Sequence, residues 1–238
     1  MKLFKDLEKS IDIKFKDEKI YIDAFTHRSY TNEHRTPGVV DNERLEFLGD
    51  AVLELVSTKH LYNNYPDQDE GKMTSFRSAL VKGQHLAEVA VNLNLGKYLR
   101  LSHGEERSGG REKGYILANA LEAMIGAIYL DRGYPFAEKF IQQNILSHLD
   151  GIINRGLHID SKSKFQELSQ EKLQVTPVYK IIAEEGPDHD KKFTMGAYIN
   201  DELVATGEGS SKQKAEDQAA HNALIKKGWN TKDMNHAE

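Results

Sequence analysis

The chain has 238 residues, of which 39% are apolar and 29% charged, and it contains no cysteine. This length suits one large domain or two modest ones, and the lack of cysteine excludes disulfides and thiolate metal sites. No uncharged apolar run is long enough to span a membrane, and the charged start is unlike a secretory signal, so we expect a cytoplasmic protein. The net charge of −5 requires any nucleic-acid partner to meet clustered rather than abundant positive charge.

The first 150 residues carry apolar residues at helical spacing and predict an all-α domain. Loops are expected over 31–41, which contains Pro37 and Gly38, and over the polar, glycine-bearing stretch 102–111. The predicted helices are two short ones within residues 1–30, an acidic helix at 42–56, one or two helices within 70–96, an apolar helix at 115–130, and a last helix that reaches Asp150.

The acidic helix, NERLEFLGDAVLELV, combines carboxylates with core-forming side chains. At about 100° per residue, four carboxylates fall within an arc of about 80°. These are Glu43, Glu46, Asp50 and Glu54, and the residues expected to be buried on the other side are Leu45, Leu48, Val52, Leu55 and Val56. Like charges at this spacing repel by a few tenths of a kcal/mol per pair, so the arc needs either solvent or a cation.

Two further residues of this helix favour a covered acidic face over a solvated one. Gly49 costs about 1 kcal/mol in mid-helix relative to Ala, which indicates that another backbone comes close. Phe47 lies beside the acids of this arc. Its ring either packs inside its own domain or contacts a second copy of the chain.

The apolar helix, YILANALEAMIGAIYL, is hydrophobic on nearly all sides and should be buried. Asn119 and Glu122 are its strongly polar side chains and share one face. A buried carboxylate needs either a basic partner or a metal ion. If this face meets Glu46 and Asp50, the result is an oxygen-rich site suited to Mg²⁺ or Mn²⁺, and its chemistry would be metal-assisted phosphodiester hydrolysis.

The run ERLEFLGDAVL at 43–53 resembles the signature of the ribonuclease III family, endonucleases that cut double-stranded RNA. The resemblance implies that Glu46, Asp50 and Glu122 bind the metal, that Asp50 and Glu122 are catalytic, and that Glu43 is a supporting acid. The family usually has ILAD where this chain has ILAN at 116–119, so Asn119 takes the place of a fourth acid. Its amide oxygen can still ligate Mg²⁺, but one negative charge is missing.

The resemblance also implies a homodimer in which Phe47 is our candidate contact, and two active sites along one cleft. The expected products carry 5′-phosphate and 3′-hydroxyl ends with short 3′ overhangs, from ribosomal RNA precursors and other structured transcripts. The alternative is a double-stranded RNA-binding protein that cuts poorly because of Asn119. His27 and Arg77 could either contact RNA or stabilise the fold.

After a linker at 151–158 the pattern changes to α-β-β-β-α, a small α+β domain at 159–228 followed by a flexible tail at 229–238. Asn200-Asp201 predicts a hairpin turn between the second and third strands. The expected helices lie at 163–173 and 211–226, and the expected strands lie at 177–185, 192–199 and 203–207.

Between Asp160 and Gly228 there are ten Lys and twelve Asp and Glu, which gives this domain a net charge of −2. The composition therefore argues against RNA binding, and only the positions of the lysines favour it. Lys212 and Lys214 begin the last helix, where cations oppose the helix dipole unless phosphate binds there; two solvated lysines are the alternative. The domain resembles the double-stranded RNA-binding domain. That resemblance implies RNA contacts by Gln166, Glu167, His189, Lys212, Gln213 and Lys214.

Overall fold

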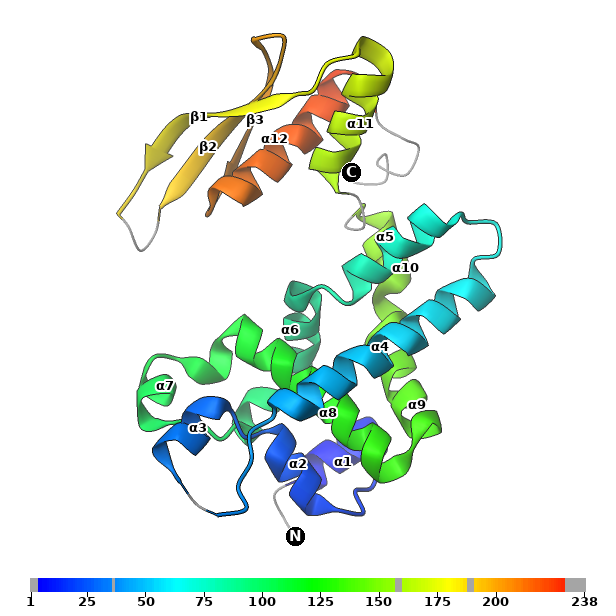
Figure 1. The fold of residues 1–238 in the computed structure, drawn as a ribbon, viewed down its shortest axis with the longest axis vertical. Helices are drawn as coiled ribbons and strands as arrows, with labels where there is room; N and C mark the ends of the chain where they lie inside the picture. The colour runs from blue at the N-terminus through cyan, green and yellow to red at the C-terminus, as the bar shows by residue number, and fades with distance from the viewer. Residues whose placement is uncertain (1–3, 36, 157–159, 188–190, 230–238) are drawn as a thin grey trace. The chain divides into compact units, whose positions relative to one another are not determined.

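The computed structural model describes residues 4–35, 37–156, 160–187 and 191–229. The chain divides into two compact units, unit 1 over Met1–Gly151 and unit 2 over Ile152–Glu238, which are described separately (Figure 1). Unit 1 is helical and unit 2 is α+β, which confirms the predicted fold class. None of the described helices has the length and apolar character that a membrane span requires.

Unit 1 is built from α-helices joined by short 3-10 helices (Figure 1). The α-helices are α1 Lys5–Ile11, α2 Glu18–Ala24, α3 Arg28–Glu33, α4 Glu43–Asn64, α5 Glu70–Leu80, α6 Gly83–Asn92, α7 His103–Arg107, α8 Gly114–Arg132 and α9 Tyr134–Asn144. Helix α10, Leu149–Asn154, begins in unit 1 and continues past its last residue, Gly151. The 3-10 helices are η1 Leu95–Tyr98, η2 Gly110–Glu112 and η3 Leu146–His148.

Several predicted boundaries in unit 1 were wrong. Residues 4–33 hold three helices, whereas two were predicted within 1–30, and the expected loop at 102–111 contains α7 and η2. The Ser102 side chain caps the start of α7 by accepting a hydrogen bond from the Glu105 amide at 3.1 Å. Helix α7 was not predicted because it is too short to show a repeat of apolar residues. The acidic helix continues past Val56 to Asn64, since no helix breaker precedes Pro66. The last predicted helix is interrupted by η3 before α10.

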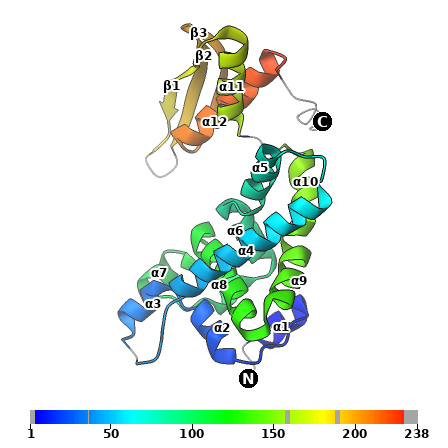
Figure 2. The ribbon, with the colours of Figure 1, turned by 45° about the vertical axis from the view of Figure 1, so that its right-hand side comes forward.

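Helix α8 forms the centre of unit 1 and packs against α2, α4, α6 and α9 (Figure 2). Its side chains from Ile116 to Ile128 are nearly all buried, which confirms the predicted buried helix. Helix α4 approaches it closely at two glycines. A Cβ on Gly49 would lie 1.7 Å from the Glu122 carbonyl oxygen, and one on Gly126 would lie 2.3 Å from the Leu45 carbonyl oxygen. The backbones therefore touch at this crossing, as Gly49 indicated.

The buried stripe of α4 is narrower than expected and is turned toward Gly49. Val52, Leu53 and Val56 are buried beside the glycine, whereas Leu55 is 57% exposed. The expectation that Leu55 is buried was wrong, because α8 covers only the stripe that contains Gly49 and not the wider apolar arc. Glu46 and Asp50 consequently lie along the edge of the helix contact instead of facing away from it.

Unit 2 comprises an antiparallel sheet in the order β1-β2-β3 with two helices packed together and α12 against the sheet. Its elements are α11 Ser161–Leu173, β1 Val178–Glu185, β2 Lys192–Ile199, β3 Glu202–Gly209 and α12 Lys212–Lys226. Small residues let α12 lie directly on β3, since a Cβ on Gly207 would be 2.1 Å from the Ala219 nitrogen. Asn200 and Asp201 form the predicted hairpin turn with φ of 49° and 63°.

The described chain ends at Trp229, which belonged to the expected tail. Its ring packs near Phe165 with centroids 5.8 Å apart, at the edge of the hydrophobic core of unit 2. The rest of that predicted tail, 230–238, lies outside the described residues.

We predict that Gly49→Ala destabilises unit 1 by about 3 kcal/mol, because the new methyl group would overlap the backbone of α8. Urea unfolding followed by the circular dichroism of the helices measures this change. Tryptophan fluorescence would not measure it, because the single tryptophan, Trp229, lies in unit 2. Gly83→Ala is the control, because no atom lies within 4 Å of a Cβ at this first residue of α6. Equal midpoints for the two variants would contradict the close crossing.

Candidate functional site

The contact between α4 and α8 brings together the four oxygen-bearing residues that the sequence singled out. The side-chain amide of Asn119 hydrogen-bonds the Glu46 carboxylate, and the charges of Glu46 and Asp50 both act on Glu122. Asp50 is exposed, whereas the other three are partly buried. We call Glu46, Asp50, Asn119 and Glu122 the acidic site.

Burial and mutual repulsion disfavour ionisation in the acidic site. Burial, followed by the charges of Asp50 and Glu46, raises the pKa of Glu122 to about 7. Burial also raises the pKa of Glu46, and the hydrogen bond from Asn119 opposes that rise. The protein thus holds carboxylates closer than their charges favour, and a bound cation would relieve the repulsion.

The donor set of the acidic site fits a hard divalent cation. It offers carboxylate and amide oxygens without sulfur or imidazole, which are the ligands that Mg²⁺ and Mn²⁺ prefer. The exposed side chain of Asp50 leaves one side open to water and to a substrate phosphate. These observations satisfy the sequence expectation that Glu122 meets other carboxylates instead of a basic partner.

The other two carboxylates of the acidic arc are paired with arginines. Glu43 lies 3.1 Å from Arg28 and its charge raises the pKa of Glu46, while Glu54 lies 3.0 Å from Arg77. Arg77 also donates a hydrogen bond to Thr58 at 2.9 Å, so its contacts tie α5 to α4. Glu43 therefore borders the acidic site, and Glu54 and Arg77 serve packing.

His27 has a local structural role at the start of α3. Its Nδ1 accepts a hydrogen bond from the Ser29 amide at 3.3 Å, which caps the helix. Burial lowers the pKa of His27, so the neutral form that this cap requires is favoured. Of its two sequence-based interpretations, the geometry supports stabilisation of the fold.

Phe47 points away from its own domain, with 81% of its surface exposed. It lines an open pocket of about 1030 Å³ together with other apolar side chains, among them Val40, Leu45 and Leu130. The alternative that Phe47 is buried within its own domain was wrong. An exposed ring beside an apolar hollow is the arrangement that an interface between copies requires.

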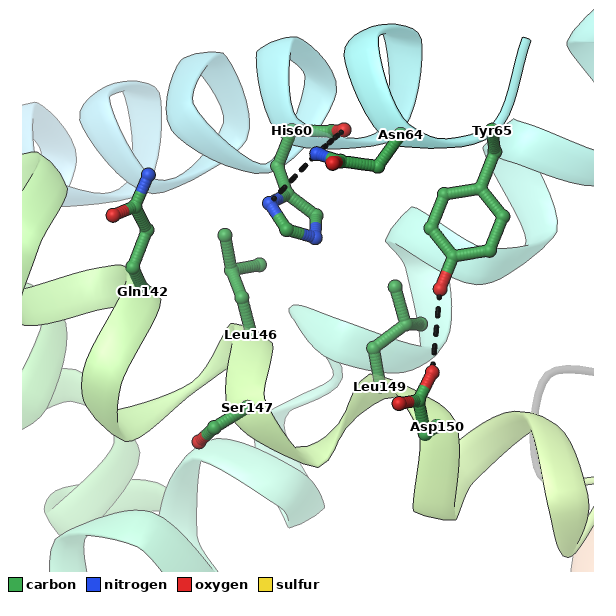
Figure 3. A pocket seen from close by; sticks show the side chains of 8 residues that line it. All are labelled: His60, Asn64, Tyr65, Gln142, Leu146, Ser147, Leu149 and Asp150. Carbon is green, nitrogen blue, oxygen red and sulfur yellow. Dashed lines mark hydrogen bonds between the residues drawn. The ribbon is translucent and has the colours of Figure 1, made fainter.

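A second open pocket, of about 670 Å³, lies between the end of α4 and the segment from α9 to α10 (Figure 3). His60 and Tyr65 enter it from α4 and its C-terminal end, and the Tyr65 hydroxyl reaches Asp150 at 3.5 Å. Burial lowers the pKa of His60. None of the acidic-site residues lines this pocket, so it is a separate feature.

In unit 2 the expected RNA contacts lie on the exposed surfaces of two neighbouring helices. Gln166 and Glu167 are exposed on α11, and Lys212, Gln213 and Lys214 are exposed at the start of α12. His189 lies outside the described residues. Lys212 is 3.2 Å from Glu184, and Glu167 is 3.2 Å from Lys164, so part of this surface is already paired.

Gly126, the partner of Gly49 across the helix crossing, was not predicted from the sequence. A second mid-helix glycine in a buried helix is the signal that could have found it, because glycine there costs about 1 kcal/mol unless close packing requires it. This residue contributes no ligand. It sets the depth at which Glu122 meets α4.

Each of the two units matches a known protein family. Residues 17–149 match the family model described as ribonuclease-III-like, and residues 161–227 match the double-stranded RNA binding motif. The chain is 45% identical over 223 residues to Ribonuclease 3 of Clostridium perfringens, covering 94% of this chain and 93% of that one. It is 44% identical over 220 residues to Ribonuclease 3 of Enterococcus faecalis, covering 92% and 95%.

A similar solved structure is the nuclease domain of ribonuclease III from Campylobacter jejuni, described for structural flexibility in a region involved in dimer formation. It is 42% identical with a TM-score of 0.56, and the match covers 60% of this chain and 96% of that one.

We predict that metal-free Glu122→Gln is more stable than the unsubstituted protein at about pH 8, by on the order of 1 kcal/mol after allowance for solvent screening. The folded pKa of about 7 lies above the ordinary value of 4.5, so the folded state holds an extra proton between them. Stability that Glu122 contributes therefore falls as pH rises through this window.

Toward about pH 5 the advantage of the glutamine should shrink, because the folded carboxyl is then neutral too. Urea unfolding with a chelator at several pH values measures it. Glu88→Gln on the exposed face of α6 is the control. A pH-independent difference for Glu122→Gln would contradict the raised pKa.

Proposed function

Because this chain belongs to the ribonuclease III family of endoribonucleases, we propose that it hydrolyses double-stranded RNA with Mg²⁺ as its cofactor, Mn²⁺ being able to substitute. The proposed products carry 5′-phosphate and 3′-hydroxyl ends with short 3′ overhangs. The proposed substrates are ribosomal RNA precursors and other structured transcripts. The absence of cysteine agrees with action in a reducing cytoplasm.

The observation that carries the proposal is the meeting of four oxygen-bearing side chains at the glycine crossing of α4 and α8. Glu46, Asp50, Asn119 and Glu122 would hold the ion. When bound, Mg²⁺ supplies a water of lowered pKa and neutralises charge on the attacked phosphate. Asp50 and Glu122, in their ionised forms, would be the catalytic residues that hold the ion and orient a water.

The protein's own contribution is to hold its ligands in place before RNA arrives. The backbone contact at Gly49 fixes the separation of the two helices, and the amide of Asn119 orients Glu46. Glu43, held by Arg28, adds negative charge beside the site. Such preorganisation lowers the reorganisation needed during reaction.

We assign duplex binding to unit 2, which matches the double-stranded RNA binding motif. Gln166, Glu167 and His189 would address 2′-hydroxyls and base edges in the minor groove, while Lys212, Gln213 and Lys214 would meet the phosphates between. Domains of this kind span about 16 base pairs and recognise shape more than sequence. The lysines make the binding depend on salt.

We further propose that the chain acts as a homodimer through the face of unit 1 that carries Phe47. The exposed ring lies beside an apolar hollow on the same face, so a two-fold arrangement would bury both at once. The similar nuclease domain from Campylobacter jejuni has a region involved in dimer formation, which supports the proposal. A dimer would place two acidic sites on one duplex.

A rival function is binding of double-stranded RNA with little cleavage. The observation in its favour is Asn119, which takes the place of a charged ligand and donates a hydrogen bond to Glu46. That hydrogen bond competes with metal for the same carboxylate. Cleavage and binding must therefore be measured separately.

We predict that the protein cuts a perfect RNA duplex with Mg²⁺ and that Glu122→Gln lowers the rate at least about 100-fold, since several kcal/mol of transition-state stabilisation depend on the bound ion. Duplex affinity in Ca²⁺ should stay unchanged, because unit 2 supplies most of it. Gel-resolved cleavage and filter binding measure the two quantities. Tight binding without cutting by either protein would refute the catalytic proposal.

In the same assay Asn119→Asp decides between the two functions. The proposal predicts a change in cleavage rate of less than about tenfold, because the amide oxygen already serves as a ligand. The rival predicts a large gain with unchanged duplex binding. That outcome would show that the asparagine weakens the site.

For the dimer we predict that Phe47→Ala raises the dimer dissociation constant about 30-fold, as expected for loss of about 2 kcal/mol at a central aromatic contact. Sedimentation equilibrium measures it. Tyr62→Ala is the control, because Tyr62 is 74% exposed on the same helix and does not line the pocket of Phe47. An equal effect of both substitutions would contradict the proposed interface.

A further inference from the structure

A second group of potential metal ligands lies where the end of α3 meets the start of α7. It consists of Glu33, His34 and His103, and one ligand atom from each lies within 4.8 Å of the others. The three residues belong to elements other than α4 and α8, so they are distinct from the acidic site. Two imidazoles and a carboxylate also differ from its all-oxygen donor set.

The ring of His34 is held by a hydrogen bond and by stacking. Its Nδ1 lies 3.2 Å from the Tyr30 carbonyl oxygen, and because a carbonyl only accepts, Nδ1 must carry the proton. In the neutral imidazole, Nε2 then carries the lone pair. The Tyr30 ring stacks on His34 at a centroid distance of 4.2 Å and is covered in turn by the Arg100 guanidinium, also at 4.2 Å. Metal-binding histidines are commonly fixed by such a carbonyl.

The carboxylate of Glu33 is fixed as well. One oxygen accepts a hydrogen bond from the His103 backbone amide at 2.8 Å, while the other contacts Nδ1 of the same residue. These hydrogen bonds lower the pKa of Glu33, which favours the ionised form. The His103 imidazole and the Glu33 carboxylate are thus bridged by a proton, and a cation could replace that proton.

A simple ion pair between Glu33 and His103 accounts for two of the three residues. It does not account for His34, whose ring faces that of His103 with centroids 6.2 Å apart and planes 29° from parallel. The nearby acid Glu106 is paired with Arg111 at 2.6 Å, and the charge of His103 also acts on it. The third donor is the feature that points to a metal ion.

We propose that Glu33, His34 and His103 bind a divalent transition-metal ion, with Zn²⁺ as the best fit. Imidazole nitrogen with one carboxylate suits Zn²⁺, whereas Mg²⁺ prefers oxygen. Three protein ligands leave a fourth tetrahedral position for water. The ion would join the end of α3 to the start of α7 and stabilise unit 1 by binding only its folded form.

The test is calorimetric titration of the full-length protein with Zn²⁺ in excess Mg²⁺, the ion that we propose for the acidic site. We expect binding that weakens at least about tenfold in His34→Ala and in His103→Ala, as for loss of groups that determine metal affinity. Glu33→Gln should also weaken it, because the amide keeps an acceptor for the His103 backbone but loses the charge. His221→Ala, in α12 of unit 2, should leave it unchanged.

A measurement without substitutions guards against misfolded variants. Zn²⁺ should protect His34 and His103 of the unsubstituted protein from diethyl pyrocarbonate, as mapped by mass spectrometry, and leave His221 reactive. Unchanged modification of both residues, or Zn²⁺ affinity that survives all three substitutions, would overturn the proposal. So would the absence of Zn²⁺ binding in excess Mg²⁺.

Discussion

The backbone contact between α4 and α8 is the constraint on which the arrangement of unit 1 depends. Gly49 and Gly126 leave no room for a side chain at the crossing, so the helices meet at a depth that bulkier residues would forbid. Glu46 and Asp50 stand beside one glycine, and Glu122 supplies the carbonyl that the other helix touches. The same contact that packs the core thereby sets the distance between the carboxylates.

This geometry has an electrostatic cost that the surrounding core offsets. Glu122 lies on a helix whose other side chains are largely buried apolar groups, and its pKa of about 7 reflects both lost hydration and neighbouring charge. Asn119 moderates the cost, because it contributes an oxygen without a charge and hydrogen-bonds Glu46. An Asp there would strengthen attraction for a cation and at the same time increase repulsion in its absence. In the proposed metal site this residue would thus trade metal affinity against stability of the metal-free fold.

The local sequence pattern predicted helices whose apolar residues repeat over several turns. It did not predict burial that depends on contacts between helices. The buried helix around Leu121 and the hairpin at Asn200 follow from periodicity and turn chemistry alone. Leu55 was misplaced because helical angle does not tell which part of an apolar arc a neighbour covers. The acidic site was accessible from sequence since its residues carry a familiar motif. The cluster of Glu33 and His103 was not, because 70 positions separate them and no spacing links them.

Unit 2 raises a different question, which is how a domain with net negative charge binds a polyanion. The positions of the lysines give part of the answer. Lys212 and Lys214 are both exposed at the start of α12, where backbone amides also face outward. Lys212, however, lies 3.2 Å from Glu184 and over the Phe193 ring, so in the proposed RNA contact a phosphate would compete with that carboxylate. Under this proposal binding would exchange one ion pair for another, and the gain from releasing counterions would be smaller than the number of lysines suggests. Shape recognition through uncharged contacts along the minor groove must supply the remainder.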